Sequence, residues 1–328
     1  MKNKEYRFLS LMMPLLLIVF LTLSCGLIGQ LEQPDDLLVE TPDLLRDELE
    51  FEILANESRD GSNVTAGVVS NRSDHLYSVQ ILMEYLNASG KLLGTQPGAV
   101  FDIYPGTEQA FFSTTADDWS QAASVDVKVT NIDKDETTDI TPDFEFGKLS
   151  IFQHEHGTRI LGEVTNNDER QYSINVLGIA FDADQRASMG NIANIDHLQP
   201  GEIRMFTVEL LGDQTQAVTA QVYLESITQV EDTPENPNLA VENIGALYDP
   251  ERGRTSIHYD LVNQDPRAYE TVQLLIGAYQ QSRLVQIDSD VVFSIGPGET
   301  IPVDKSLMEG NLEGYEIKIQ VNSYRVVP

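Results

Sequence analysis

Few residues of this chain have the types and spacing that chemistry requires. His154 and His156 flank Glu155, so in an extended segment their imidazoles would lie on one side and could bind one metal ion. No third ligand can be identified from the spacing, and the alternative is a solvated strand edge. Asp182 and Asp184 resemble the start of a calcium loop, but the glycine and the closing glutamate of an EF-hand are missing. A hairpin turn is the alternative there.

Trp119 is the only tryptophan, and it follows two aspartates. An indole can stack on a sugar or grip a peptide, but it more often covers the edge of a hydrophobic core. The sequence contains no Gly-x-Ser-x-Gly, no phosphate-binding loop and no His-Glu-x-x-His. We therefore predict that the protein is not an enzyme and uses no cofactor. Trp119 remains a weak candidate for ligand binding.

The single cysteine, Cys25, lies where a covalent modification would place it. Lys2, Lys4 and Arg7 precede an uncharged, mostly apolar stretch from Phe8 to Ser24, which is typical of a secretory signal. The sequence Leu-Thr-Leu-Ser-Cys-Gly that closes it resembles a bacterial lipoprotein signal, which implies cleavage before Cys25 and lipidation of that residue. We expect a membrane anchor on the extracytoplasmic face, with inner or outer membrane left open. The alternative is an uncleaved signal anchor with an incidental cysteine.

The charge of the chain excludes some partners. Fifty-two acidic and 21 basic residues give a net charge of −31. Such a field repels nucleic acid and favours cations or basic partners, although solubility alone is the simpler explanation. With no second cysteine there is neither a disulfide nor a cysteine-based zinc site. We predict no nucleic-acid partner, and a membrane contact through Cys25 only.

The chain repeats one frame three times, and this frame must position every candidate above. In each copy an Asn ends a short apolar strand, and 34 residues later a Pro-Gly pair begins. The copies start 95 and then 97 residues apart. They run from Asn71 to Pro105-Gly106, from Asn166 to Pro200-Gly201 and from Asn263 to Pro297-Gly298. A spacing held this closely indicates tandem repeats.

Apolar residues around the frame recur at even offsets, which keeps them on one face of a strand. Large apolar residues stand two before and six after each proline: Ile103 and Phe111, Leu198 and Phe206, Ile295 and Val303. Residues 174–181 form a more continuous apolar run than the matching segments. Several short alternating strands per copy, with turn signals between them, predict an all-β chain of three tandem Ig-like antiparallel β-sandwiches.

The predicted organisation follows from these copies and from the acidic, proline-containing stretches between them. It comprises a signal peptide at 1–24, Cys25 with an acidic tether at 25–48, sandwiches at 49–132, 144–228 and 238–328, and linkers at 133–143 and 229–237.

With the repeat established, the three units resemble the FxLYD-type domains of secreted and lipid-anchored bacterial proteins. Gly67 to Asn71 and Gly162 to Asn166 match the Gly-x-Val-x-Asn strand end, and residues 85–94 match the aromatic strand and its turn. Pro200-Gly201-Glu202 and Pro297-Gly298-Glu299 match the third element. The third copy departs most, because Tyr259 replaces the glycine. The resemblance implies an Ig-like sandwich that binds or spaces, and it brings no catalytic residues.

Three functions agree with these observations. The first is a non-enzymatic lipoprotein that acts as a protein-binding or scaffold module, with basic or envelope proteins as partners. The second is a purely structural envelope spacer. The third is a carbohydrate- or cation-binding module that uses Trp119 or the acidic loops.

Overall fold

The computed structural model describes residues 47–59, 62–115, 117, 119–135, 141–154, 157–183, 187–210, 217–230 and 237–327. The expected signal peptide, Cys25 and the tether lie outside them, apart from the last two tether residues. The described chain is nearly all β, with 73% in strands and 1% in helix, so the all-β prediction is confirmed. Residues Glu40–Pro328 form one compact unit. No helix among the described residues has both the length and the apolar character needed to cross a bilayer.

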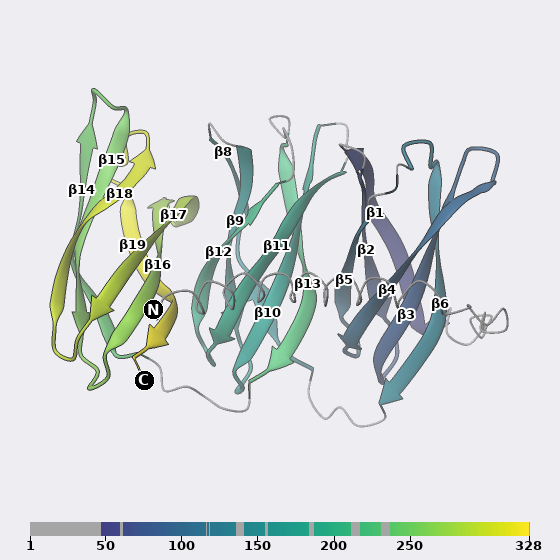
Figure 1. Cartoon of the computed structure of the whole chain (residues 1–328), viewed down its shortest axis with the longest axis horizontal. Coiled ribbons are helices and arrows are strands. Elements are labelled where there is room, and N and C mark those ends of the chain that lie inside the picture. The colour runs from purple at the N-terminus through teal and green to yellow at the C-terminus, as the bar shows by residue number, and fades with distance from the viewer. Residues whose placement is uncertain are drawn as a thin grey trace, which may run out of the picture. The chain divides into compact units, whose positions relative to one another are not determined.

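The first sandwich consists of two three-stranded antiparallel sheets (Figure 1). We call the sheet built from the first, second and fifth strands of a sandwich its first sheet, and the other its second sheet. The first sheet contains β1 (Leu49–Arg59), β2 (Ser62–Asn71) and β5 (Glu108–Thr115). The second sheet contains β4 (Leu92–Ile103), β3 (Leu76–Leu86) and β6 (Ser124–Asp135).

The second and third sandwiches repeat this arrangement (Figure 1). In the second, the first strand is split into β7 (Phe144–Phe146) and β8 (Ser150–His154), and β9 (Gly157–Asn166) and β12 (Ile203–Glu209) complete the first sheet. Its second sheet contains β11 (Ala187–Leu198), β10 (Tyr172–Phe181) and β13 (Thr219–Gln229). In the third sandwich, the first sheet contains β14 (Leu239–Asp249), β15 (Arg254–Asn263) and β18 (Thr300–Glu309). Its second sheet contains β17 (Arg283–Ile295), β16 (Tyr269–Gln280) and β19 (Glu316–Val326).

Each sandwich buries its own core between its two sheets. In β3 every second residue from Tyr77 to Tyr85 is buried, and the residues that alternate with them are more exposed, which is the pattern of a strand with one face in a core. Three separate clusters of buried residues follow, one for each sandwich. The recurring apolar residues beside each proline belong to these clusters: Ile103 and Phe111, Leu198 and Phe206, Ile295 and Val303.

A buried asparagine in each sandwich explains the 34-residue spacing. The side-chain nitrogen of Asn166 donates to the backbone carbonyl oxygens of Arg170 (2.7 Å) and Leu198 (3.1 Å). The backbone carbonyl of Asn166 accepts from the backbone N–H of Gly201 (2.8 Å). Asn71 and Asn263 bond the matching turns in the same way. The asparagine therefore ties the end of the second strand to the Pro-Gly turn before the fifth. The glycines of these turns have φ of 69–70°, a left-handed conformation that suits a residue without Cβ.

The strands extend beyond the expected domain boundaries. β6 continues to Asp135, three residues into the segment that we expected to be a linker, and β13 continues to Gln229. Both final strands pair along their length with the central strand of their sheet, β3 or β10. The connections between sandwiches are shorter than the acidic and proline-rich composition suggested, because strand pairing includes their first residues.

Candidate functional site

The most developed sites of this chain are the joints, the surfaces where one sandwich contacts the next. In the first joint, the outward side chains of β2 and β5 pack against the outward side chains of β10. The buried members of this cluster are Val64, Ala66, Val68, Ala110, Leu177 and Ile179. The first sheet of one sandwich is thus covered by the second sheet of the following one. This explains why residues 174–181 form a more continuous apolar run than the matching segments, since most of that strand is buried on both faces.

The second joint uses the same two sheets of its sandwiches. Leu161 of β9 and Met205 of β12 point outward and pack against Leu275, Tyr279 and Ile287 of the third sandwich. Met205 is 1% exposed and Tyr279 is 2% exposed, so the contact removes them from water as completely as a core does.

Both joints are fastened by a side chain at one equivalent position, the fourth residue after the proline of the turn. In the first joint the Gln109 side-chain nitrogen donates to the carbonyl oxygen of Glu225 at 2.9 Å. In the second, Arg204 Nη1 donates to the carbonyl oxygen of Asn322 at 3.2 Å. Glu225 and Asn322 are themselves equivalent, because each lies 25 residues after its own proline. We call Gln109 and Arg204 the joint residues.

The joint residues also bind their own sandwich at equivalent places. Gln109 donates to the carbonyl of Phe101 (2.6 Å) and Arg204 to that of Asp196 (3.2 Å), each four residues before the proline. Gln109 is 1% exposed and Arg204 is 6% exposed. In the first joint Gln109 also forms a parallel bridge with Leu224, which merges two sheets into one of six strands.

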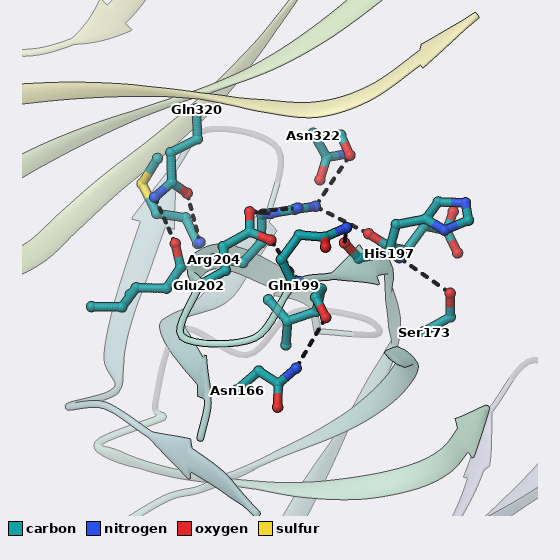
Figure 2. A network of polar contacts seen from close by, with 12 residues as sticks. Asn166, Ser173, His197, Gln199, Glu202, Arg204, Gln320 and Asn322 are labelled. Atoms are coloured by element: carbon teal, nitrogen blue, oxygen red, sulfur yellow. Dashed lines mark hydrogen bonds and ion pairs between the residues drawn. The ribbon is translucent and has the colours of Figure 1, made fainter. Parts of the chain in front are cut away.

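The second joint connects directly to the Pro-Gly turn of its sandwich (Figure 2). Glu202 accepts from Arg204 Nε at 2.8 Å and from Nη2 at 2.6 Å, through the same carboxylate oxygen. Its other oxygen accepts from the Gln199 amide at 2.8 Å, inside the turn that Asn166 holds. The repeat frame therefore fixes Glu202, Glu202 orients the guanidinium, and the guanidinium reaches the third sandwich at Asn322.

Further side chains of the third sandwich cross the second joint, among them Arg283, whose Nε donates to Ser150 Oγ at 2.8 Å. The Gln320 amide accepts from the Met205 backbone N–H (2.9 Å) and donates to the Ile203 carbonyl (2.9 Å), so it satisfies the free edge of β12 as a strand neighbour would. The Tyr279 hydroxyl donates to Glu163 Oε1 at 2.7 Å. Burial first, and this hydrogen bond second, raise the pKa of Tyr279 well above its usual value of 10.0.

A hollow of about 580 Å³ lies beside this network. Asp196, His197, Glu202 and Arg204 line it from the second sandwich, and Gln320 and Tyr324 from the third. The Glu202 carboxylate and the Arg204 guanidinium on its wall form an ion pair, and Asp196 adds a second carboxylate, so the wall is polar. The hollow forms where the two sandwiches meet, so it belongs to the second joint.

The candidates that the sequence offered for metal binding do not form a cluster among the described residues. His154 ends β8 and stacks on Phe152 with ring centroids 5.7 Å apart, whereas His156 lies outside the described residues. Asp182 directly follows β10, which ends at Phe181, and Asp184 is likewise outside the described part. No group of three or more metal-ligating side chains occurs in the residues that the structure describes. Cys25 also falls outside them, so its lipidation stays a prediction.

Trp119 lies in the core of the first sandwich. It is 8% exposed, its ring stacks on Tyr85 with centroids 3.9 Å apart, and it lies directly over Gly94. A Cβ at position 94 would come within 2.7 Å of the indole, so the glycine makes room for it. The side chain covers the core edge, and little of its face is accessible to a sugar.

Comparisons with known proteins assign no family. No family model matches the chain, and no curated protein matches it, so membership of the FxLYD-type family stays a prediction. One similar solved structure is the dimeric latent PorU from Porphyromonas gingivalis, at 13% identity and a TM-score of 0.19. That match covers 86% of this chain and 33% of the PorU chain, and a likeness this weak carries no argument about function.

Proposed function

We propose that the protein is a non-enzymatic, membrane-anchored extracytoplasmic lipoprotein that acts as a protein-binding scaffold. The single observation that supports it most is the repeated joint. A chain of independent binding modules needs only flexible linkers, whereas this one uses Gln109 and Arg204 at equivalent positions to fix each sandwich to the next. Fixed spacing between modules is useful where partners must be held in a set arrangement.

The anchor is the second part of the proposal, and it rests on the sequence. The lone Cys25, placed after a charged and then apolar leader, would carry the acyl chains. Each buried methylene contributes about 0.8 kcal/mol, so more than one acyl chain holds a protein stably on a bilayer. The acidic chain would attract basic envelope proteins rather than nucleic acid or anionic lipid.

Chemical cross-linking in native membranes, followed by purification of the acylated chain, tests the proposal. We expect a mature chain that begins at Cys25 with added acyl mass, and one or more specific protein adducts. A chain that still begins at Met1 without acyl mass contradicts the anchor. The absence of any specific adduct, together with normal envelope behaviour after deletion of residues 238–328, would instead favour a structural spacer. Carbohydrate binding through Trp119 has lost its main support, because that ring is buried.

A further inference from the structure

The first sheet of the third sandwich lacks the residues that fasten the two joints. Ile301 occupies the position of Gln109 and Arg204, and it cannot donate a hydrogen bond. Pro302 follows it, at the position where Met205 donates its backbone N–H to Gln320 in the second joint. Pro302 has no N–H to offer at that edge. An edge strand with proline is protected from pairing with another sheet.

The outward face of this sheet has also changed character. At equivalent positions, β2 has Val64, Ala66 and Val68, whereas β15 has Ser256, His258 and Asp260. The face would not bury well against the apolar second sheet of another sandwich. A second copy would present the second sheet of its first sandwich, whose outward face is also polar: it carries the ion pair between Glu84 and Lys128 and the exposed Asp126.

Capping alone does not account for this face, because a cap needs only polar side chains. Leu247 on β14 is 65% exposed and points to the same side as Ser256, its partner across the strands. Ile244, in the bulge of β14, is 40% exposed. The His258 ring lies across Gly245, where a Cβ would come within 2.1 Å of it. A hollow of about 540 Å³ lies beside Leu247 and His258.

Carboxylates surround the apolar part of the hollow. Asp260 and Asp304 line it, and Asn243 donates to Asp260 Oδ2 at 2.6 Å, which fixes that carboxylate at the rim. Among the described residues that line it, none is Lys or Arg. An apolar contact with an acidic rim is complementary to a segment that carries an apolar side chain between basic ones.

We propose that this outward face of β14, β15 and β18 is the partner-binding surface of the scaffold, and that its partner is a basic protein segment with an apolar side chain that packs on Leu247. The inference rests on the proposed function and deepens it, since it names the surface and the chemical class of the partner. The surface follows the first two sandwiches in the chain, so it is far in sequence from the expected anchor at Cys25.

The test uses the full mature chain in detergent at physiological ionic strength and a labelled short peptide in which Lys alternates with Leu. Fluorescence anisotropy measures its Kd for the wild type, for Leu247→Ser and for Asp304→Asn. Matched controls are Leu92→Ser, an exposed leucine of the first sandwich, and Asp126→Asn, an exposed aspartate of β6. Both controls make the same chemical change outside the proposed surface.

We expect each surface variant to weaken binding by about tenfold and each control to leave it within about twofold. Equal weakening in variants and controls would mean that the peptide reads only the acidic field, and would overturn the proposal. Equally tight binding of a Glu–Leu peptide, or no binding of the Lys–Leu peptide, would overturn it too. A specific partner from cross-linked membranes that binds Leu247→Ser as well as wild type would leave the proposed function standing and refute this surface. Membranes that yield no specific partner would refute the proposed function itself.

Discussion

Replacing Arg204 by methionine should loosen the joint between the second and third sandwiches. Methionine keeps an unbranched apolar stem but loses the donors to Glu202, Asp196 and Asn322. A hydrogen bond from a charged group contributes about 1.5–3 kcal/mol, and the Asn322 bond is long at 3.2 Å, so we take about 1.5 kcal/mol for the link. Since about 1.4 kcal/mol is a factor of ten, the joint should open about ten times more often.

Hydrogen exchange at the backbone amide of Met205 reads this opening directly, because that N–H donates to Gln320 across the joint. We expect about tenfold faster exchange at Met205 in Arg204→Met. Arg204→Lys should lie close to it, because an ammonium cannot make the forked contact to Glu202. The matched control is Arg170→Met, whose side chain bonds Gln229 and pairs with Asp168 inside the second sandwich. Unchanged exchange in Arg204→Met, or equal acceleration in Arg170→Met, would refute the reasoning.

Three other predictions concern the frame and its ionisable groups. Asn166→Ala should lower the free energy of unfolding by about 3 kcal/mol in urea titration, because three buried or partly buried hydrogen bonds of about 1 kcal/mol each are lost. A loss below about 1 kcal/mol would contradict the stabilising role of this asparagine. Tyr279 has a raised pKa, so its bond to Glu163 stabilises the joint below about pH 10 and this stabilisation is lost as the pH rises above that value. The free energy of unfolding of Tyr279→Phe should therefore fall less at alkaline pH than that of wild type, and parallel plots of this free energy against pH would contradict the prediction. The hydrogen bond from Arg267 holds the pKa of Asp265 well below 3.8, so the stability that this bond contributes is present above about pH 4 and is lost as the pH falls below it. The urea midpoint of Asp265→Asn should vary less at acid pH than that of wild type. An equal acid dependence of the two midpoints would contradict a stabilising bond between Asp265 and Arg267.

The sequence was sufficient for the strands and the frame, because local patterns determine both. Large apolar residues at even offsets from Pro105, Pro200 and Pro297 were expected on one face of a strand, and they lie in the three cores. The glycine after each proline adopts the left-handed conformation of the turn. The recurring Asn was visible as a repeat. Its function as a buried donor to two carbonyls was not, because those carbonyls belong to residues 4 and 32 positions away.

The joints could not be predicted in the same way. Gln109, Arg204 and Ile301 occupy the same position and differ in identity, so no shared residue type marks it. The outward residues of β2 and β9 look like ordinary strand neighbours until the covering sheet is known. One feature of the sequence did indicate the first joint. Residues 174–181 form a more continuous apolar run than the matching segments, which indicates a strand that is buried on both faces by a covering neighbour.

Trp119 shows the opposite failure, in which a conspicuous residue type suggested a site that the fold does not support. Trp119 is conspicuous because it is the only tryptophan, whereas its place in the core is determined by Gly94 beneath the ring and Tyr85 beside it. The residues that connect the sandwiches are glutamines, arginines and a tyrosine, which are common residue types, so composition alone does not single them out.

Whether the sandwiches are held together as one body is the claim on which the scaffold depends. Backbone ¹⁵N relaxation on residues 40–328 measures the rotational correlation time of each sandwich separately. If Gln109 and Arg204 fasten the joints as we infer, amides of all three sandwiches should report one common, long correlation time. Shorter and different correlation times for the three sandwiches would show that they reorient independently, and would contradict the account.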